Sequence, residues 1–231
     1  MYKYETHLHT SPVSKCADAS PREALEFYKK LGYDGVFITN HFIDGYFDCQ
    51  KETPTREQIA ENFSDYDTAK ELSAEIGIKV FLGLEMTHGG TDFLIYGLEK
   101  QWFLDHPEIA GMKKSLALPI LMEAGALVIQ AHPFREARYI DHIRLYPRCV
   151  QGVEIINANR TDFENAMAMH YAESYGLLTT AGSDNHRAER QPKLAGMCSS
   201  TPIADEKDFI NRIRNREMEI FTQDNPLIKS E

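Results

Sequence analysis

The 231-residue sequence predicts a chain of the α/β class, and three observations support this. Short apolar runs bounded by turn residues recur along the chain, and amphipathic segments of helical length separate them. Several of the runs end directly before a histidine or a carboxylate. Because functional residues of parallel βα units gather where the strands end, we expect these side chains to converge at one edge of a sheet or barrel.

The first predicted strand, over residues 4–10, ends in a His-x-His pair. Side chains of an extended strand alternate between its two faces, so His7 and His9 project to the same side, within reach of one cation. The pair predicts half of a metal site at the start of the chain.

Four later apolar runs each end in a residue that binds hard or borderline metals. They cover residues 35–40, 79–84, 127–131 and 177–183. The residues that follow them are His41, Glu85, His132 and Asp184, with His186 two positions further on.

Helix signals occupy the stretches between these strands. Ser20, Pro21 and Glu23 form an N-terminal helix signature, and Gly32 ends the helix that follows. Further helices are expected over 55–76, 112–124, 162–175 and 206–216, and further strands over 92–97 and 152–157. The irregular segments 42–54 and 134–139 directly follow candidate ligands, so we expect them to contact substrate.

Composition limits the remaining possibilities. The chain is 42% hydrophobic, enough for one sizeable core, so we expect a single domain over residues 1–231. No run is long enough to span a bilayer and no signal peptide is evident, which predicts a cytoplasmic protein. A formal net charge of −10 argues against a protein that coats nucleic acid. The four cysteines lack metal-knuckle or disulfide spacing and are expected to be reduced.

The ordered motifs resemble those of the PHP family, named for polymerase and histidinol phosphatase. They are His7-x-His9, Thr39-Asn40-His41, Gly83-Leu84-Glu85, Ala131-His132-Pro133 and Gly182-Ser183-Asp184-Asn185-His186. The resemblance implies a distorted (β/α)7 barrel, similar to a TIM barrel, and a phosphoesterase with two or three divalent transition metals.

The resemblance also implies how the ligands are shared. His7, His9, Glu85 and Asp184 would hold one metal. Glu85 would bridge to a second metal that His132 also holds, and His41 and His186 would hold a third. Zinc, manganese and iron all suit this mixture of imidazole and carboxylate.

Two positions depart from the family pattern. The family has an aspartate six residues after the second histidine, whereas here Cys16 or Asp18 would replace it. Many family members have a histidine after the residue equivalent to Glu85, just before a strand, and in this chain Asp92 occupies that position. We favour Asp92 as a ligand over the competing His88, whose neighbouring glycines indicate an exposed turn.

The expected reaction is hydrolysis of a small phosphorylated metabolite, such as histidinol phosphate, a sugar phosphate or a nucleoside monophosphate. Bound metals would activate the water. Arg135 is the best candidate for holding the phosphate, ahead of Arg160 and Arg187. His186 or His41 is a candidate proton donor to the leaving group. An amidohydrolase-like enzyme is the first alternative, although Glu85 stands where that superfamily usually has a bridging lysine. A non-catalytic metal-binding module is the second alternative, and the sequence does not predict the oligomeric state.

Overall fold

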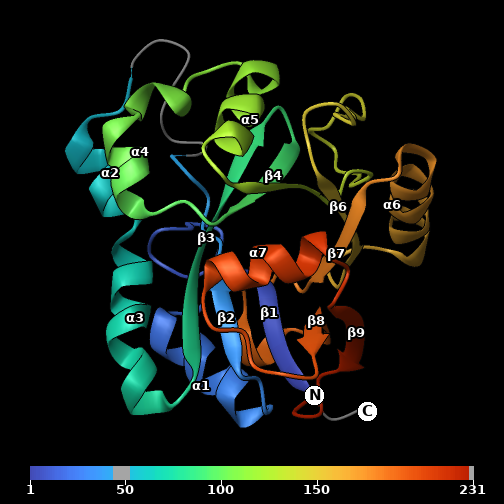
Figure 1. Cartoon of the computed structure of the whole chain (residues 1–231). Coiled ribbons are helices and arrows are strands. Elements are labelled where there is room, and N and C mark those ends of the chain that lie inside the picture. Colours follow the sequence, from blue (N-terminus) through green and yellow to red (C-terminus); the bar gives the residue numbers. More distant parts are fainter. Residues whose placement is uncertain (44–52, 229–231) are drawn as a thin grey trace.

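The structure is a computed structural model that describes residues 1–43 and 53–228, and its architecture is a mixed α/β, nearly closed barrel (Figure 1). The strands form a nine-stranded sheet in the order β7-β6-β5-β4-β3-β2-β1-β8-β9. The strands are β1 (Tyr2–Leu8), β2 (Gly35–Ile38), β3 (Lys79–His88), β4 (Thr91–Tyr96), β5 (Leu127–Ala131), β6 (Gly152–Asn157), β7 (Leu178–Gly182), β8 (Lys193–Ser199) and β9 (Glu219–Asp224).

The sheet is not uniformly parallel, which corrects the expectation of repeated parallel units. Strands β3 and β4 pair antiparallel through the two-residue turn Gly89-Gly90, and both glycines have positive φ. A two-residue turn closes a hairpin, whereas a parallel crossover needs a dozen or more residues. Strands β8 and β9, which the sequence did not reveal, also pair antiparallel.

The barrel comes close to closing around β1. Strand β7, at one end of the sheet, contacts both β1 and β8. Leu8, the last residue of β1, forms an isolated parallel bridge with Asn185, which lies just past β7. This closure brings the residues that follow β7 beside those that follow β1.

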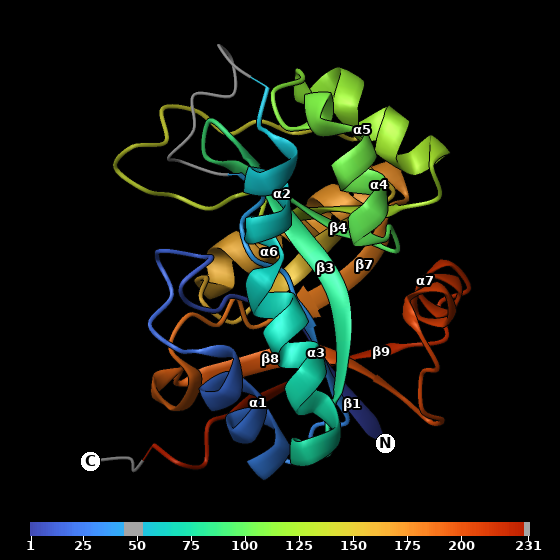
Figure 2. The same ribbon diagram turned by 90° about the vertical axis from the view of Figure 1, so that its left-hand side faces the viewer.

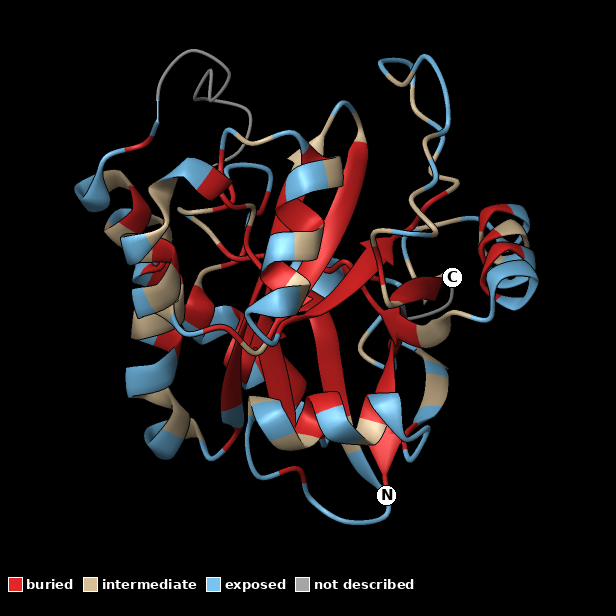
Figure 3. Ribbon diagram, turned by 45° about the horizontal axis from the view of Figure 1, so that its top comes forward, coloured by how far each residue is buried: buried red, intermediate tan, exposed pale blue. Residues whose placement is uncertain are grey.

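Helices cover the outside of the sheet (Figures 1 and 2). Helices α1 and α3 pack together on one flank, and α6 packs on β6. The outward faces of these helices are exposed, while most strands are buried (Figure 3) and β9 is only partly buried. The α-helices are α1 (Pro21–Lys30), α2 (Arg56–Asn62), α3 (Ser64–Ile76), α4 (Lys100–Asp105), α5 (Lys114–Glu123), α6 (Asp162–Tyr175) and α7 (Glu206–Arg214), and the 3-10 helices are η1 (Pro107–Ile109) and η2 (Ala188–Arg190).

The helix expected over 55–76 is two helices, α2 and α3, which meet at Phe63. The Phe63 side chain is buried against Phe42 and Phe103, with ring centroids 6.2 and 5.7 Å away. Tertiary packing of one aromatic side chain therefore overrides a continuous helical pattern.

Helix α7 packs against the aromatic side chains in the interior of the barrel. The Phe209 ring lies 4.4 Å from Phe37 and 5.4 Å from Tyr96, centroid to centroid. Most candidate ligands lie instead near the carboxyl ends of β1, β2, β3, β5 and β7, whereas Asp92 lies near the amino end of the antiparallel strand β4. Of the segment expected to contact substrate after His41, residues 44–52 lie outside the described residues. Within the described ranges, no helix is both long and apolar enough to cross a membrane.

Candidate metal centre

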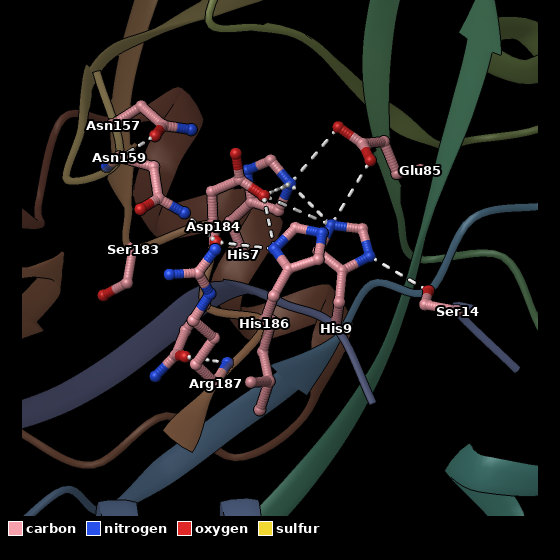
Figure 4. A network of polar contacts seen from close by, with 12 residues as sticks. His7, His9, Ser14, Glu85, Asn157, Asn159, Ser183, Asp184, His186 and Arg187 are labelled. Carbon is pink, nitrogen blue, oxygen red and sulfur yellow. Dashed lines mark hydrogen bonds and ion pairs between the residues drawn. The ribbon is translucent and has the colours of Figure 1, made fainter. Parts of the chain in front are cut away.

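Seven candidate ligands from separate parts of the sequence converge at one end of the barrel. Figure 4 labels His7, His9, Glu85, Asp184 and His186 among them. Their nitrogen and oxygen atoms form three groups in which all ligand atoms lie within 4.8 Å of one another. These groups are His7, Glu85 and His132; His7, His9 and Asp184; and His9, His41 and His186. The structure therefore brings together all the candidate ligands that the sequence singled out except Cys16 and Asp92, which belong to none of the three groups.

Glu85 lies at the middle of this arrangement. Its Oε1 is 3.2 Å from His7 Nε2 and 3.4 Å from His132 Nε2. Its Oε2 is 3.3 Å from His9 Nε2 and 2.9 Å from His41 Nδ1. A carboxylate whose two oxygens face different imidazoles has the geometry needed to bridge two cations.

The donor atoms fit a bound metal. His7 Nε2 and His9 Nε2 lie 3.1 Å apart, and both are also 3.5 Å from Asp184 Oδ1. The opposite ring nitrogens face other partners: His7 Nδ1 is 2.8 Å from Glu154 Oε1 and His9 Nδ1 is 3.0 Å from Ser14 Oγ. When each Nδ1–H donates to these oxygens, two Nε2 lone pairs face one another, and a shared cation relieves their repulsion.

Burial and charge act in opposite directions on these groups. Burial lowers the pKa of His7, but the charges of Glu154, Asp184 and Glu85 raise it well above its ordinary value. Burial raises the pKa of Asp184, but His7 and the neighbouring imidazoles lower it to about 2. The cluster therefore keeps a carboxylate ionised in a buried place, which suits cation binding.

Local backbone features allow the ligands to approach. A Cβ on Gly182 would lie 2.4 Å from His7 Cβ, so only glycine lets β7 come this close to β1. His132 and Asp184 both have positive φ, of 24° and 52°. Non-glycine residues with this backbone are strained, and such strain clusters at functional sites.

The structure distinguishes between Cys16 and Asp18, the two candidate metal ligands at the first position that departs from the family pattern. Both residues are exposed, but Cys16 lines the cavity beside His41 and His186, whereas Asp18 forms an ion pair with Arg190 at 2.8 Å. Burial raises the pKa of the Cys16 thiol, but hydrogen bonds with His186 and His41 lower it to about 6. Cys16 is thus the residue with the position and chemistry of a ligand.

The structure also distinguishes between Asp92 and His88, the two candidate ligands at the second such position. Asp92 Oδ2 lies 3.7 Å from His132 Nε2, and Asp92 lines the cavity while His88 does not. Asp92 belongs to none of the three groups of close ligand atoms among the described residues, and its Oδ2 also accepts a hydrogen bond from Arg135 Nη1 at 3.1 Å. Asp92 therefore lies at the margin of the cluster, shared with an arginine.

A cavity of about 490 Å³ opens over the cluster. Arg135, Arg160 and Arg187 all line it, together with Tyr139, the last residue of the segment 134–139 that was expected to contact substrate. Ser14, which contacts His9, was also missed, because nothing in the sequence distinguishes its hydroxyl from that of any other turn serine. The sequence pattern does point to Glu154, because it is a lone carboxylate within an apolar strand.

Comparisons with known proteins agree with this fold. A family model described as PHP-associated matches residues 162–218. A two-domain protein of Bacteroides vulgatus, described as containing a predicted PHP-like metal-dependent phosphoesterase, is similar over 95% of this chain, with a TM-score of 0.70 and 16% identity. This chain spans 64% of the length of that protein.

Two further solved structures are similar. PsfC of Pseudomonas syringae has a TM-score of 0.62 and 16% identity over 96% of this chain and 91% of its own. An amidohydrolase of Chromobacterium violaceum has a TM-score of 0.54 and 14% identity over 95% of this chain and 97% of its own. No curated protein matches the sequence. The chain thus has a PHP-like fold, and the resemblance to the PHP family that its motifs indicated is confirmed.

Proposed function

We propose that this protein is a metal-dependent phosphoesterase that hydrolyses a small phosphorylated metabolite. One observation supports this most strongly: His7 Nε2 and His9 Nε2 face each other at 3.1 Å, with carboxylates of Glu85 and Asp184 around them. This buried donor set opens into a cavity lined by arginines, as a site for a phosphate ester requires.

The proposed ligand assignment follows the resemblance. His7, His9, Glu85 and Asp184 would hold one metal, and Glu85 and His132 a second. His41 and His186 would hold a third, with Cys16 as a further ligand, and Asp92 would complete the set beside His132. Zinc, manganese and iron fit these donors. Divalent cations supply two things when bound: an activated water and neutralisation of phosphoryl oxygens.

Arg135 is placed to receive the phosphate. Asp92 fixes one end of its guanidinium, and the Tyr139 ring lies 5.5 Å from the guanidinium carbon. Burial lowers the pKa of Arg135, but the charges of Asp92 and Tyr139 raise it overall, so the guanidinium stays charged. Its remaining N–H groups can donate to phosphoryl oxygens in the cavity.

His186 is the proposed proton donor if two metals occupy the site. Its Nδ1 donates to the Asp184 carbonyl oxygen at 2.9 Å, which orients the ring at the cavity wall. Burial lowers the pKa of His186, but Cys16 and Asp184 raise it above its ordinary value. A protonated imidazole here can protonate the departing oxygen.

The size of the cavity supports a small substrate. A volume of about 490 Å³ is within the range of small-molecule sites and suits histidinol phosphate, a sugar phosphate or a nucleoside monophosphate. No lysine is among the described residues that line the cavity, so the bridging lysine usual in amidohydrolases is missing from this wall.

The test begins with metal content, measured by mass spectrometry on protein purified without chelator. We expect about two or more transition-metal ions per chain and less metal in His9→Ala. His170→Ala is the matched control, because His170 is an exposed histidine on α6 near Glu173. Release of phosphate from the three substrate classes is then measured with the metal found. Less than about one ion per chain, unchanged in His9→Ala, would overturn the proposal.

A further inference from the structure

A set of buried hydrogen bonds connects helix α3 to His9. The set consists of Asp65 on α3, Asn40 after β2 and Ser14 in the turn after β1, and we call it the Ser14 relay. All three side chains are buried, with at most 5% of each residue exposed. We propose that the Ser14 relay is a positioning device that fixes the tautomer of His9, so that its Nε2 lone pair always faces the metal cluster.

The orientation of the Asn40 amide is fixed from two sides. Its Oδ1 accepts the backbone N–H of Thr10 at 2.7 Å, and a backbone N–H can only donate. Its Nδ2 therefore faces the other way, where it donates to Asp65 Oδ2 at 3.1 Å and to Thr10 Oγ1 at 2.9 Å. Asp65 Oδ2 also accepts the backbone N–H of Val13 at 3.1 Å, which shows that this oxygen is an acceptor.

The orientation of the Asn40 amide determines where the hydroxyl proton of Ser14 points. Ser14 Oγ lies 3.0 Å from Asn40 Oδ1, an atom that can only accept, so the single hydroxyl proton points there. The same oxygen accepts the backbone N–H of His41 at 3.1 Å. Ser14 Oγ has no second proton to donate.

The tautomer of His9 follows from this. Its Nδ1 lies 3.0 Å from Ser14 Oγ, which can only accept from it, so Nδ1 carries the proton (Figure 4). The Nε2 atom is then unprotonated where it faces His7 Nε2 at 3.1 Å and Glu85 Oε2 at 3.3 Å. In the opposite tautomer, an N–H would project into the metal cluster and Nδ1 would lie unpaired against an oxygen.

The inference rests on the metal-binding part of the proposed function, but its test does not depend on catalysis. The first measurement is the tautomer of His9 in the metal-free protein, read from the ¹⁵N shifts of its ring nitrogens at about pH 8, above the ordinary imidazole pKa of about 6.5. The Nδ1–H form is expected in the wild type. A wild-type His9 with the proton on Nε2 alone would overturn the inference even if metal binding and turnover are intact.

The second measurement compares Ser14→Ala with wild type. Without the hydroxyl, His9 loses the acceptor that selects its tautomer, so we expect a mixture of tautomers and a fall of about 10- to 100-fold in metal affinity, measured by competition with a chelating dye. Ser199→Ala is the matched control, because Ser199 is also buried and bonded to a carbonyl, that of Thr201, away from the cluster.

A merely structural role for Ser14 predicts a different result. Both alanine variants would then lower the melting temperature while the His9 tautomer and the metal affinity stay at wild-type values, and that result would overturn the inference. If the wild type binds no metal while His9 shows the expected tautomer and Ser14→Ala changes it, the relay stands and the proposed function fails.

Discussion

Replacement of Glu154 by glutamine is expected to weaken metal binding, because it reverses the tautomer of His7. Glu154 Oε2 accepts the backbone N–H of His132 at 3.1 Å and the side-chain N–H of Asn157 at 2.9 Å. The Asn157 amide is itself fixed, because its Oδ1 accepts the backbone N–H of Asn159. A glutamine at 154 must therefore place its oxygen toward these two donors.

The amide nitrogen of Gln at 154 would then face His7 Nδ1, where Glu154 Oε1 lies at 2.8 Å in the wild type. An NH₂ group in that place donates to Nδ1, so the ring proton moves to Nε2, the atom 3.2 Å from Glu85 Oε1. A loss of this kind of outer partner typically weakens metal binding about 10- to 100-fold. At ~1.36 kcal/mol for each tenfold change, this corresponds to about 1.4 to 2.7 kcal/mol.

The assay is a competition titration of each protein against a chelating dye, with circular dichroism to show that the variants are folded. Glu164→Gln is the control, since Glu164 is also largely buried and its carboxylate accepts the backbone N–H of Glu136 and of Thr161, but no imidazole. Equal metal affinity in Glu154→Gln and wild type would refute the reasoning about His7.

Three further predictions follow from the site and the core. Asp184→Ala, or removal of metal with a chelator, is expected to abolish phosphate release while the circular dichroism spectrum shows that the protein stays folded. Added zinc, manganese or iron should restore activity only to the chelator-treated wild type, and turnover in Asp184→Ala would contradict the assignment. Arg135→Ala is expected to raise KM for phosphoesters by about 10-fold or more, because a charge-assisted hydrogen bond contributes about 1.5 to 3 kcal/mol; initial rates test this, and an unchanged KM would assign phosphate binding to another residue. Phe209→Ala is expected to lower the free energy of unfolding by about 3 to 5 kcal/mol, since the ring is fully buried against Phe37 and Tyr96; urea denaturation measures this, and a loss under about 1 kcal/mol would mean that α7 contributes little to the core.

The sequence predicted most of the elements because their signals are local. The capping box at Ser20 and Glu23, the helix over 162–175 and the apolar strand runs all appear in the structure where expected. The long helical pattern over 55–76 failed for a non-local reason, the packing of Phe63 against Phe42 and Phe103. Strands β8 and β9 were missed because neither is a continuous apolar run: β8 contains Gly196 and small side chains, and β9 is mostly polar and only partly buried.

By itself, the sequence determined that the histidines at 7, 9, 41, 132 and 186 meet Glu85 and Asp184 in one cluster, because residues near the ends of the strands of one barrel are carried to the same end. Only the tertiary structure decided how they meet. The choice between Cys16 and Asp18, the pairing of Asp92 with Arg135, and the contacts of Glu154 and Ser14 with the histidine rings depend on distances across the barrel. Alternation along a strand fixes the face to which a side chain points, but hydrogen-bond geometry between distant segments fixes which atom of that side chain is free to bind.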